Sequence, residues 1–318
     1  MQTHNRGGAI VPGADIAVRT EELSKLYGTR EALVGLDLTV PAGQVFGFLG
    51  PNGAGKTTTI GILCTLLRPT LGHAWVAGAH VAREAGRVRR RIGVVFQEQT
   101  LDQDLTAMES MRMQAELYGL PGPAARAAST ALLDLMGLAD RAGHVVRTLS
   151  GGTRRRLEIA RALVHGPRVL FLDEPTTGLD PQTRAAVREH LRLLCREHGI
   201  TVFLTTHHLE EAEHCDRIAI IDDGELVAEG SPGELKAVIG ADLVTLRTDD
   251  DERVAEAVRR LFGVATVTGP GGVRLRAPDG AALVPRLCAE LTVPIHSVTV
   301  APPTLDDVFL HHTGRTIR

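Results

Sequence analysis

Gln44 to Leu67, QVFGFLGPNGAGKTTTIGILCTLL, is the stretch of sequence that decides the fold. Its apolar start, Val45 to Leu49, predicts a short buried strand, and the apolar residues after the glycines recur at helical spacing. Glycines between the two elements let backbone N–H groups converge on one concavity. The pattern Gly-x4-Gly-Lys-Thr at 50 to 57 is that of a phosphate-binding P-loop, so a nucleotide site is predicted.

The residue types of this loop suit a nucleoside triphosphate with Mg²⁺. The helix N-terminus and loop amides hold the α- and β-phosphates, Lys56 reaches the β- and γ-phosphates, and the Thr57 hydroxyl is a ligand for Mg²⁺. An ordinary glycine-rich turn is the alternative. The complete motif between a strand and a helix favours nucleotide binding.

Length and charge set limits on architecture and partners. The 318 residues exceed what one core usually organises, so we expect one large and one small domain. The net charge of −3 gives no general attraction to nucleic acid, and no nucleic-acid partner is expected. Five arginines between Arg83 and Arg91 are interpreted as a solvated helix face, because no aromatic residues are interleaved for base stacking.

Membrane and export signals are not expected in this chain. Residues 1–14 lack the apolar core of a signal peptide and are predicted to form a flexible tail. No apolar run approaches the roughly 20 residues that span a bilayer, so the chain should have no transmembrane segment of its own. The four cysteines lie far apart and are interpreted as free buried thiols in a reducing compartment.

Polar residues follow three further apolar runs, at the point where each predicted strand ends: Gln97, Asp173 with Glu174, and Thr205 to His207. Helical patterns separate these runs, so the sheet should be largely parallel. Open α/β sheets bind ligands at the carboxyl ends of their strands. These polar side chains are therefore predicted to converge on the nucleotide.

Two carboxylates follow one of these strands. In a P-loop protein Asp173 is the expected Mg²⁺ partner. Glu174 is then placed to take a proton from attacking water, and capping the turn at Pro175 is the alternative. His207 is catalytic or structural on this evidence, since the spacing of the nearby histidines does not support a zinc site.

The segment Leu149 to Thr153, LSGGT, begins another predicted helix. Ser150 is a good N-cap, and Gly151 and Gly152 leave amides open to an anion. Three arginines follow in the first turn and oppose the helix dipole unless an anion or a carboxylate is near. The segment is therefore either a capped helix or a second phosphate-contacting site.

The two ends of the chain carry different patterns. Residues 15–40 alternate around a turn after Tyr27, which predicts antiparallel strands, and Tyr27 is either a base-stacking or a half-buried strand residue. Residues 241–318 follow the order β-α-β-β-α-β, which suits a small ferredoxin-like α+β domain. A stability appendage without a ligand of its own is the simplest interpretation of this domain.

Taken together, these motifs resemble those of ATP-binding cassette (ABC) ATPases. The resemblance covers residues 15–240 and rests on GPNGAGKTT at 50–58, Gln97, LSGGT at 149–153, LFLDEP at 170–175, GLD at 178–180 and TTHH at 205–208. It implies a P-loop NTPase core with an antiparallel β subdomain and a helical subdomain at about 98–160. The ending PTLDDVFL at 303–310 resembles the tails of drug-exporter ATPases of the daunorubicin-resistance type, where the tail is regulatory or serves assembly.

The resemblance also implies roles for individual residues, with ATP and Mg²⁺ as the ligands. The implied catalytic residues are Lys56, Gln97, Glu174 and His207, and the implied metal ligands are Thr57, Gln97 and Asp173. The implied nucleotide-binding residues are Tyr27, Gly50, Asn52, Gly53, Gly55, Lys56, Thr57, Thr58, Ser150, Gly151, Gly152 and Asp180. One departure is Thr153, where the family often has Gln. The contacts of the serine and the glycines should keep their geometry, and the effect of Thr153 on the rate of ATP hydrolysis is left open.

In that family, Ser150 and Gly152 contact the γ-phosphate held by an opposing protomer, which implies a head-to-tail dimer of the ATPase. The resemblance further implies a separate polytopic permease, which contacts the helical subdomain at Leu105 to Met113, and a place at the cytoplasmic face of the membrane. Export of a drug-like or lipid-like substrate is the predicted function. Two alternatives remain: a non-transport ATPase acting on DNA or ribosomes, and an importer ATPase.

Overall fold

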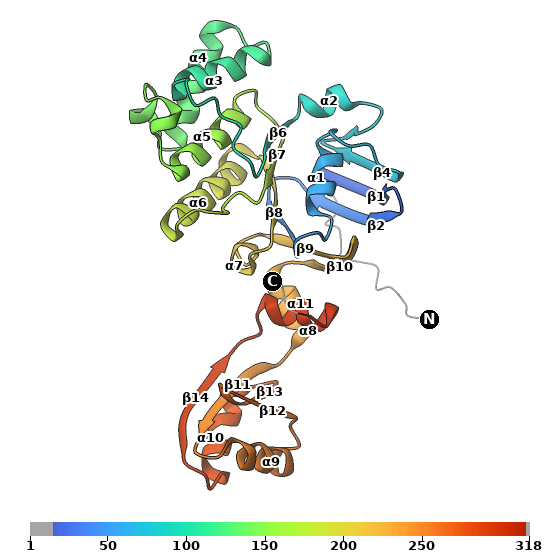
Figure 1. Cartoon of the computed structure of the whole chain (residues 1–318), viewed down its shortest axis with the longest axis vertical. Coiled ribbons are helices and arrows are strands. Elements are labelled where there is room, and N and C mark those ends of the chain that lie inside the picture. The colour runs from blue at the N-terminus through green and yellow to red at the C-terminus, as the bar shows by residue number, and fades with distance from the viewer. Residues whose placement is uncertain (1–14, 316–318) are drawn as a thin grey trace. The chain divides into compact units, whose positions relative to one another are not determined.

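The computed structural model describes residues 15–315 (Figure 1). The predicted tail at 1–14 and the last residues of the predicted C-terminal domain lie outside the described residues. The chain divides after Pro232 into two compact units, whereas the sequence placed the boundary after Gly240. The difference is the helix α8 (Pro232–Ile239), most of which falls in the second unit.

The first unit is built on a six-stranded sheet with the order β10-β9-β3-β8-β7-β6. As predicted for its central strands, β3, β8, β7 and β6 are parallel; β9 is also parallel to β3, and β10 is antiparallel. Every residue of β3, β7 and β8 is buried, as expected for strands covered on both faces. The strands are β3 (Val45–Leu49), β6 (Ile92–Val95), β7 (Val169–Asp173), β8 (Thr201–Thr206), β9 (Arg217–Asp222) and β10 (Glu225–Gly230).

Helices pack on this sheet and link its strands. α1 (Lys56–Leu63) follows β3 and contacts β7, α5 (Gly151–Leu163) contacts β6, and α6 (Pro181–His198) contacts β8. Two short helices, α2 (Ala85–Arg89) and α7 (Leu209–Ala212), lie in the connections before β6 and β9. The strand-loop-helix order predicted around the P-loop is therefore the one observed.

A second, antiparallel sheet has the order β2-β1-β4-β5, and its β1–β2 turn follows Tyr27 as the sequence predicted. Its strands are β1 (Ile16–Tyr27), β2 (Arg30–Pro41), β4 (Leu71–Val76) and β5 (Ala79–His80). Leu23 and Leu36 of this sheet share one buried cluster with Phe48 and Phe203 of the parallel sheet. The two sheets therefore pack on one core, which fixes the β1–β2 turn beside the P-loop (Figure 1).

The helical region between β6 and β7 contains α3 (Ala107–Leu117), α4 (Gly122–Leu135) and the start of α5, with 3₁₀ turns at Ala139–Arg141 and Val146–Thr148. Thr106 begins α3 with a capping box that pairs it with Glu109. Pro121 precedes α4, at the Pro-Gly-Pro break of the sequence. In Figure 1 these helices form a group of their own above α6.

The second unit is the ferredoxin-like fold that the pattern predicted. Its antiparallel sheet has the order β12-β13-β11-β14. Val254 of α9 and Leu287 of α10 belong, with residues of the sheet, to one buried hydrophobic core. The elements are β11 (Asp242–Thr248), α9 (Asp251–Phe262), β12 (Thr266–Gly269), β13 (Gly272–Ala277), α10 (Gly280–Glu290), β14 (Ile295–Ala301) and α11 (Leu305–Thr313). Asp307 of α11 pairs with Arg276 of β13, which ties the PTLDDVFL segment to this sheet.

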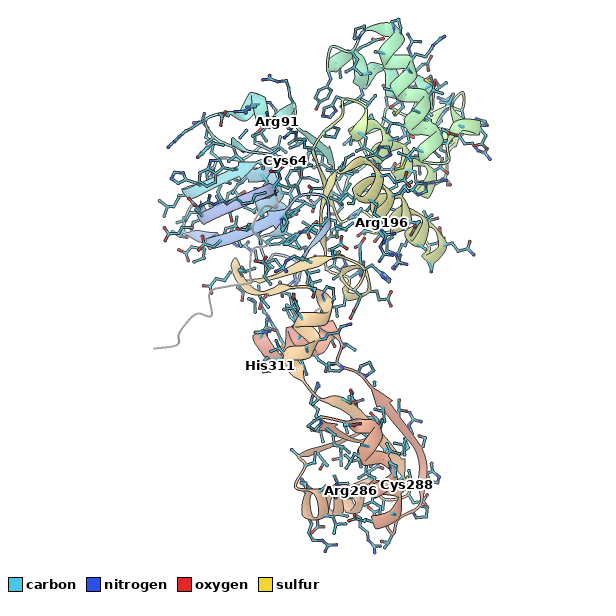
Figure 2. All side chains as sticks on the ribbon, turned by 180° about the vertical axis from the view of Figure 1, so that it is seen from behind. Cys64, Arg91, Arg196, Arg286, Cys288 and His311 are labelled. Atoms are coloured by element: carbon cyan, nitrogen blue, oxygen red, sulfur yellow. The ribbon has the colours of Figure 1, made fainter. Side chains whose placement is uncertain are left out.

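The cysteines differ in their surroundings, and one expectation about them is wrong. Cys64, Cys195 and Cys215 are buried free thiols, whereas Cys288 is exposed on α10 (Figure 2). Leu287 faces the core of the second unit, and the next residue of a helix lies about 100° further round, away from that core. Separately, no helix within residues 15–315 is both long and apolar enough to cross a membrane.

Candidate nucleotide site

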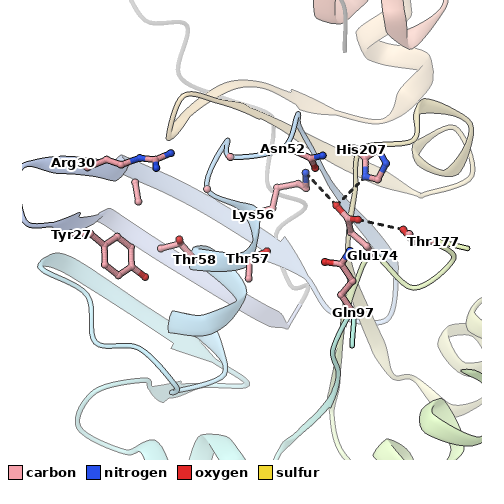
Figure 3. Close-up of a pocket in the computed structure, with 13 residues that line it drawn as sticks. Tyr27, Arg30, Asn52, Lys56, Thr57, Thr58, Gln97, Glu174, Thr177 and His207 are labelled. Atoms are coloured by element: carbon pink, nitrogen blue, oxygen red, sulfur yellow. Dashed lines mark hydrogen bonds and ion pairs between the residues drawn. The ribbon is translucent and has the colours of Figure 1, made fainter. Parts of the chain in front are cut away.

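A cavity of about 580 Å³ lies over the P-loop in the first unit (Figure 3). Its walls come from the β1–β2 turn, the P-loop with the start of α1, and the ends of β6, β7 and β8. The lining residues are Tyr27, Arg30, Ala32, Asn52, Gly53, Gly55, Lys56, Thr57, Thr58, Gln97, Glu174, Thr177 and His207. The cavity has the volume of a small-molecule site, and most of the side chains predicted from the sequence lie on it.

Glycines shape the loop below this cavity. Gly55 precedes α1 with φ of 107°, a left-handed conformation that residues with a Cβ rarely adopt. A Cβ at Gly50 would lie 2.3 Å from the carbonyl oxygen of Ile221, so only glycine fits between the loop and β9. The N-terminus of α1 is thereby turned toward the cavity, where its free amides and dipole favour an anion.

Lys56 is buried at the floor of the cavity. Its Nζ donates to the carbonyl oxygens of Gly50 at 2.7 Å and Pro51 at 3.1 Å, and lies 3.6 Å from the Glu174 carboxylate. Burial lowers the pKa of Lys56 below its ordinary value, although Glu174 and Asp173 act in the opposite direction. The ammonium group is therefore positioned by the loop and poorly solvated, so a phosphate here would gain a strong electrostatic contact.

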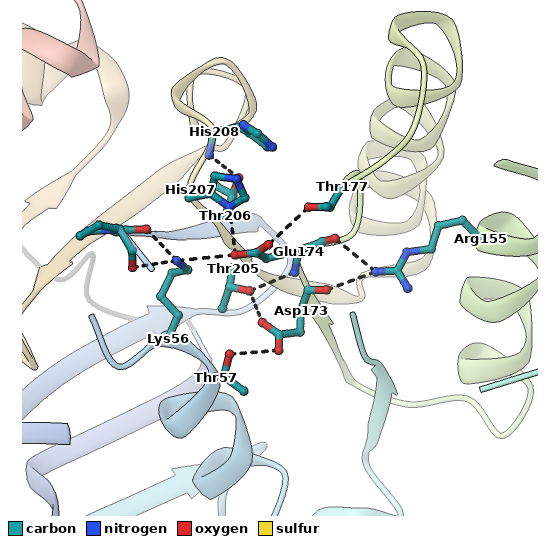
Figure 4. Close-up of polar contacts among 12 residues, drawn as sticks. Lys56, Thr57, Arg155, Asp173, Glu174, Thr177, Thr205, Thr206, His207 and His208 are labelled. Atoms are coloured by element: carbon teal, nitrogen blue, oxygen red, sulfur yellow. Dashed lines mark hydrogen bonds and ion pairs between the residues drawn. The ribbon is translucent and has the colours of Figure 1, made fainter. Parts of the chain in front are cut away.

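Asp173 and Thr57 bring two hard oxygen ligands together at the end of β7. The Thr57 hydroxyl lies 3.3 Å from Asp173 Oδ2, while Asp173 Oδ1 accepts a hydrogen bond from Thr205 at 2.5 Å (Figure 4). Gln97 adds an amide to the wall of the same cavity that Thr57 lines. A hydroxyl, a carboxylate and an amide oxygen are the donor types that Mg²⁺ prefers, so these residues fit that ion.

Glu174 has its carboxylate at the centre of the polar contacts in Figures 3 and 4. His207 Nδ1 donates to Oε1 at 3.0 Å, and the Thr177 hydroxyl donates to Oε2 at 3.3 Å. Burial disfavours the charged form, but His207, Lys56 and Thr177 outweigh it and hold the pKa of Glu174 below its ordinary value. Near neutral pH the side chain is a carboxylate and can accept a proton.

Five residues predicted to bind nucleotide do not line this cavity: Gly50, at the start of the P-loop, and Ser150, Gly151, Gly152 and Asp180. Ser150 caps α5 by accepting from Thr153 N at 3.3 Å, and its hydroxyl lies 2.8 Å from that of Thr153. Asp180 caps α6 in the same way, through Thr183 N at 3.0 Å. Within one chain the structure shows the capped helix, and the segment is separate from the P-loop cavity.

Residues that sequence reasoning did not assign hold the site in shape. Arg155, the middle member of the arginine triplet, is buried and donates to the carbonyl oxygens of Phe96 at 2.7 Å and Pro175 at 2.8 Å. Its charge is matched by Glu158, 3.0 Å away and also buried. The i, i+3 spacing of Arg155 and Glu158 was the signal in the sequence that could have predicted this ion pair. Glu158 is a carboxylate near the three arginines, which otherwise oppose the dipole of α5.

Comparisons with known proteins identify the family of this chain. The family model described as ABC transporter matches residues 33–177, and that of the C-terminal domain of DrrA1-3-like ATP-binding proteins matches residues 230–313. Daunorubicin resistance ATP-binding protein DrrA3 of Streptomyces coeruleorubidus is 45% identical over 95% of this chain and 97% of its own. The chain belongs to the ABC transporter family. The resemblance drawn from the motifs is confirmed, and this ABC protein is an ATPase.

Further relatives place the ABC protein among export-type subunits. Nod factor export ATP-binding protein I of Ralstonia nicotianae is 40% identical over 96% of each chain. Among solved structures, the dimeric post-hydrolysis state of the ATP-binding cassette MJ0796, bound to ADP and Pi, is 30% identical. It has a TM-score of 0.61 and covers 67% of this chain and 98% of that one. The ABC protein is accordingly the ATPase subunit of an exporter-type system, and ATP is its nucleotide.

Proposed function

We propose that Glu174 is the general base that takes a proton from the water attacking the γ-phosphate of ATP. The observation that carries this proposal is the position of its carboxylate, on the cavity wall and between Lys56 and His207. In this proposal Lys56 and His207 place positive charge and hydrogen-bond donors where charge develops during phosphoryl transfer. Gln97 orients the water from the end of β6, and Tyr27 stacks on the adenine.

We further propose Thr57, Asp173 and Gln97 as the residues that hold Mg²⁺. Their hydroxyl, carboxylate and amide oxygens support this assignment. The ion, when bound with ATP, neutralises charge on the β- and γ-phosphate oxygens. Phosphate contacts by the amides of Asn52 to Gly55, and by Thr58, complete the proposed site around Lys56.

We infer a head-to-tail homodimer from the segment that lies apart from the cavity. Ser150, Gly151 and Gly152 present a capped helix start, which suits an anion, but they do not line the cavity of their own chain. In the proposed dimer they close over the ATP of the partner, and Asp180 lies at the same interface. Two copies of the chain then enclose two ATP molecules between them, and the dimer opens after hydrolysis.

A groove on the first unit offers a docking surface for the proposed membrane partner. It encloses about 330 Å³, and its lining includes exposed Leu66 and half-exposed Phe96 and Tyr118, with Arg89 and Arg161 among its polar residues. We propose that a cytoplasmic segment of a separate polytopic permease docks here, beside the helical subdomain. The ATPase would then work at the cytoplasmic face of the membrane and drive export of a drug-like or lipid-like substrate. The second unit is proposed as an accessory element for regulation or assembly.

The catalytic proposal is tested by Glu174→Gln, which keeps the shape of the side chain but removes the base. ATP binding, measured with a fluorescent analogue, should persist, and hydrolysis should fall by orders of magnitude. Glu189→Gln, a change at an exposed position of α6, is the matched control and should hydrolyse ATP normally. Wild-type turnover in Glu174→Gln would refute the assignment of the base.

The transport proposal is tested by purifying the tagged chain from its own cells in mild detergent and identifying its stoichiometric partner by mass spectrometry. Recovery of a polytopic membrane protein supports the export assignment. Ribosomal or DNA-bound partners in its place would favour the non-transport alternative and leave the ATPase site intact.

A further inference from the structure

We propose that Thr205 is a positioning residue for the ATPase reaction, which acts by holding the Asp173–Glu174 turn in its working shape. Thr205 and Asp173 are register partners in the neighbouring parallel strands β8 and β7, so their side chains meet at the end of the sheet. Thr205 is fully buried and touches the backbone of one functional residue and the side chain of the other. This inference rests on the roles proposed for Asp173 and Glu174.

The Thr205 hydroxyl both donates and accepts a hydrogen bond within this turn. The Asp173 carboxylate can only accept, so the hydroxyl proton goes to Oδ1, at 2.5 Å. The lone pair of the same oxygen accepts from Glu174 N, at 3.0 Å. The chain of two bonds is cooperative, since each bond polarises the other in a buried setting.

The turn needs such support because of the conformation of Glu174. Its φ is 46°, in the left-handed region that is unfavourable for a residue with a Cβ. Conformations of this kind persist where the surrounding structure holds them in place. The amide side of the turn is held by Thr205, and the carbonyl side by Arg155, whose Nη2 lies 3.2 Å from Asp173 O.

The consequence of this support reaches both functional side chains. A left-handed Glu174 directs its carboxylate to Lys56 and His207, as Figure 4 shows. The bond to Oδ1 fixes the rotation of Asp173, which leaves Oδ2 toward Thr57. One hydroxyl therefore sets the direction of the proposed base and of the proposed metal ligand together.

The test compares Thr205→Val with Thr201→Val in the full-length protein. Thr201 is a matched control on the same strand: it is also buried, and its hydroxyl also accepts a backbone N–H, from Gly43 at 2.9 Å. Among the described residues, the Thr201 hydroxyl makes no hydrogen bond to the Asp173–Glu174 turn. Both variants therefore lose one buried acceptor, and only Thr205→Val releases the amide of Glu174. We expect kcat, measured at saturating ATP and Mg²⁺, to fall about tenfold to a hundredfold in Thr205→Val. Thr201→Val should keep its kcat.

Two further measurements separate positioning from folding. Thr205→Ser restores the hydroxyl and should recover turnover to within about threefold of wild type. Binding of a fluorescent ATP analogue should be unchanged by Thr205→Val in EDTA, and the enhancement of binding by Mg²⁺ should shrink. Of the two residues that Thr205 holds, Asp173 contributes to binding through the proposed metal site, whereas Glu174 acts in the chemical step. Should the valine variant fail to fold, Thr205→Ala removes the same hydroxyl and should lose turnover to a similar extent.

The proposal is overturned if Thr205→Val or Thr205→Ala turns over like wild type, or if Thr205→Ser is as impaired as Thr205→Val. Equal losses of kcat in Thr201→Val and Thr205→Val would also overturn it, since the effect would then be one of stability. Failure of the base assignment is detected separately, by wild-type turnover in Glu174→Gln, so the two ideas can fail independently.

Discussion

The buried Arg155–Glu158 pair offers a sharp test of how the site is held together. Glu158 is 2% exposed and Arg155 is 7% exposed, and the Glu158 carboxylate also accepts from Thr100 N at 2.9 Å. Replacing Glu158 by Ala leaves an arginine charge buried without its counter-ion, and an arginine cannot give up its proton. Removing one partner of a buried pair costs about 3–5 kcal/mol.

This cost translates into a large thermal shift. For the unit that ends at Pro232, an unfolding entropy of about 2.1 cal mol⁻¹ K⁻¹ per residue gives about 2 °C per kcal/mol. The midpoint of thermal unfolding of Glu158→Ala should therefore fall by about 6–10 °C. Turnover should fall as well, because Arg155 holds both the Glu174 turn and the backbone before Gln97.

The assay is differential scanning calorimetry of the full-length protein, with Glu116→Ala as the matched control. Glu116 pairs with Arg112 at 3.9 Å on the exposed surface of α3, where an ion pair contributes about 0.5 kcal/mol or less. The control should therefore shift the midpoint by about 1 °C or less. Equal shifts in the two variants would refute the view that burial makes the Arg155 pair structurally decisive.

Two further predictions concern α5 and the acid stability of the first unit. Gly152→Ala should destabilise the protein because its Cβ would lie 2.3 Å from Thr183 Cγ2, whereas Gly151→Ala, which meets nothing within 4 Å, should be neutral or stabilising in thermal unfolding. Burial lowers the pKa of His80, whose Nδ1 accepts from Ala82 N at 3.2 Å, so the unfolded chain takes up a proton more readily. Stability should be complete above about pH 6.5 and decrease as the pH falls toward the lowered pKa, and His80→Gln should flatten this part of a denaturation curve measured against pH.

Much of the fold was predictable because its signals are local. The loop from Gly50 to Thr57, the apolar runs and the β-α-β-β-α-β pattern each depend on residues close together in the chain. The prediction that Cys288 is buried was wrong, because a residue next to a core position on a helix can face outward. The boundary between the two units near Pro232 could not be predicted from local sequence patterns either, because it depends on which unit α8 contacts.

The sequence by itself determined the chemical parts of the ATPase and the ends of strands at which they lie. Motif spacing is sufficient for this, because a strand, a glycine-rich loop and a helix N-terminus form from consecutive residues. Tertiary structure alone decided how those parts are held. Thr205 reaches Glu174 through strand pairing, and Arg155 reaches the same turn from a helix. Such contacts are set by register and packing between distant segments, and no local pattern encodes them.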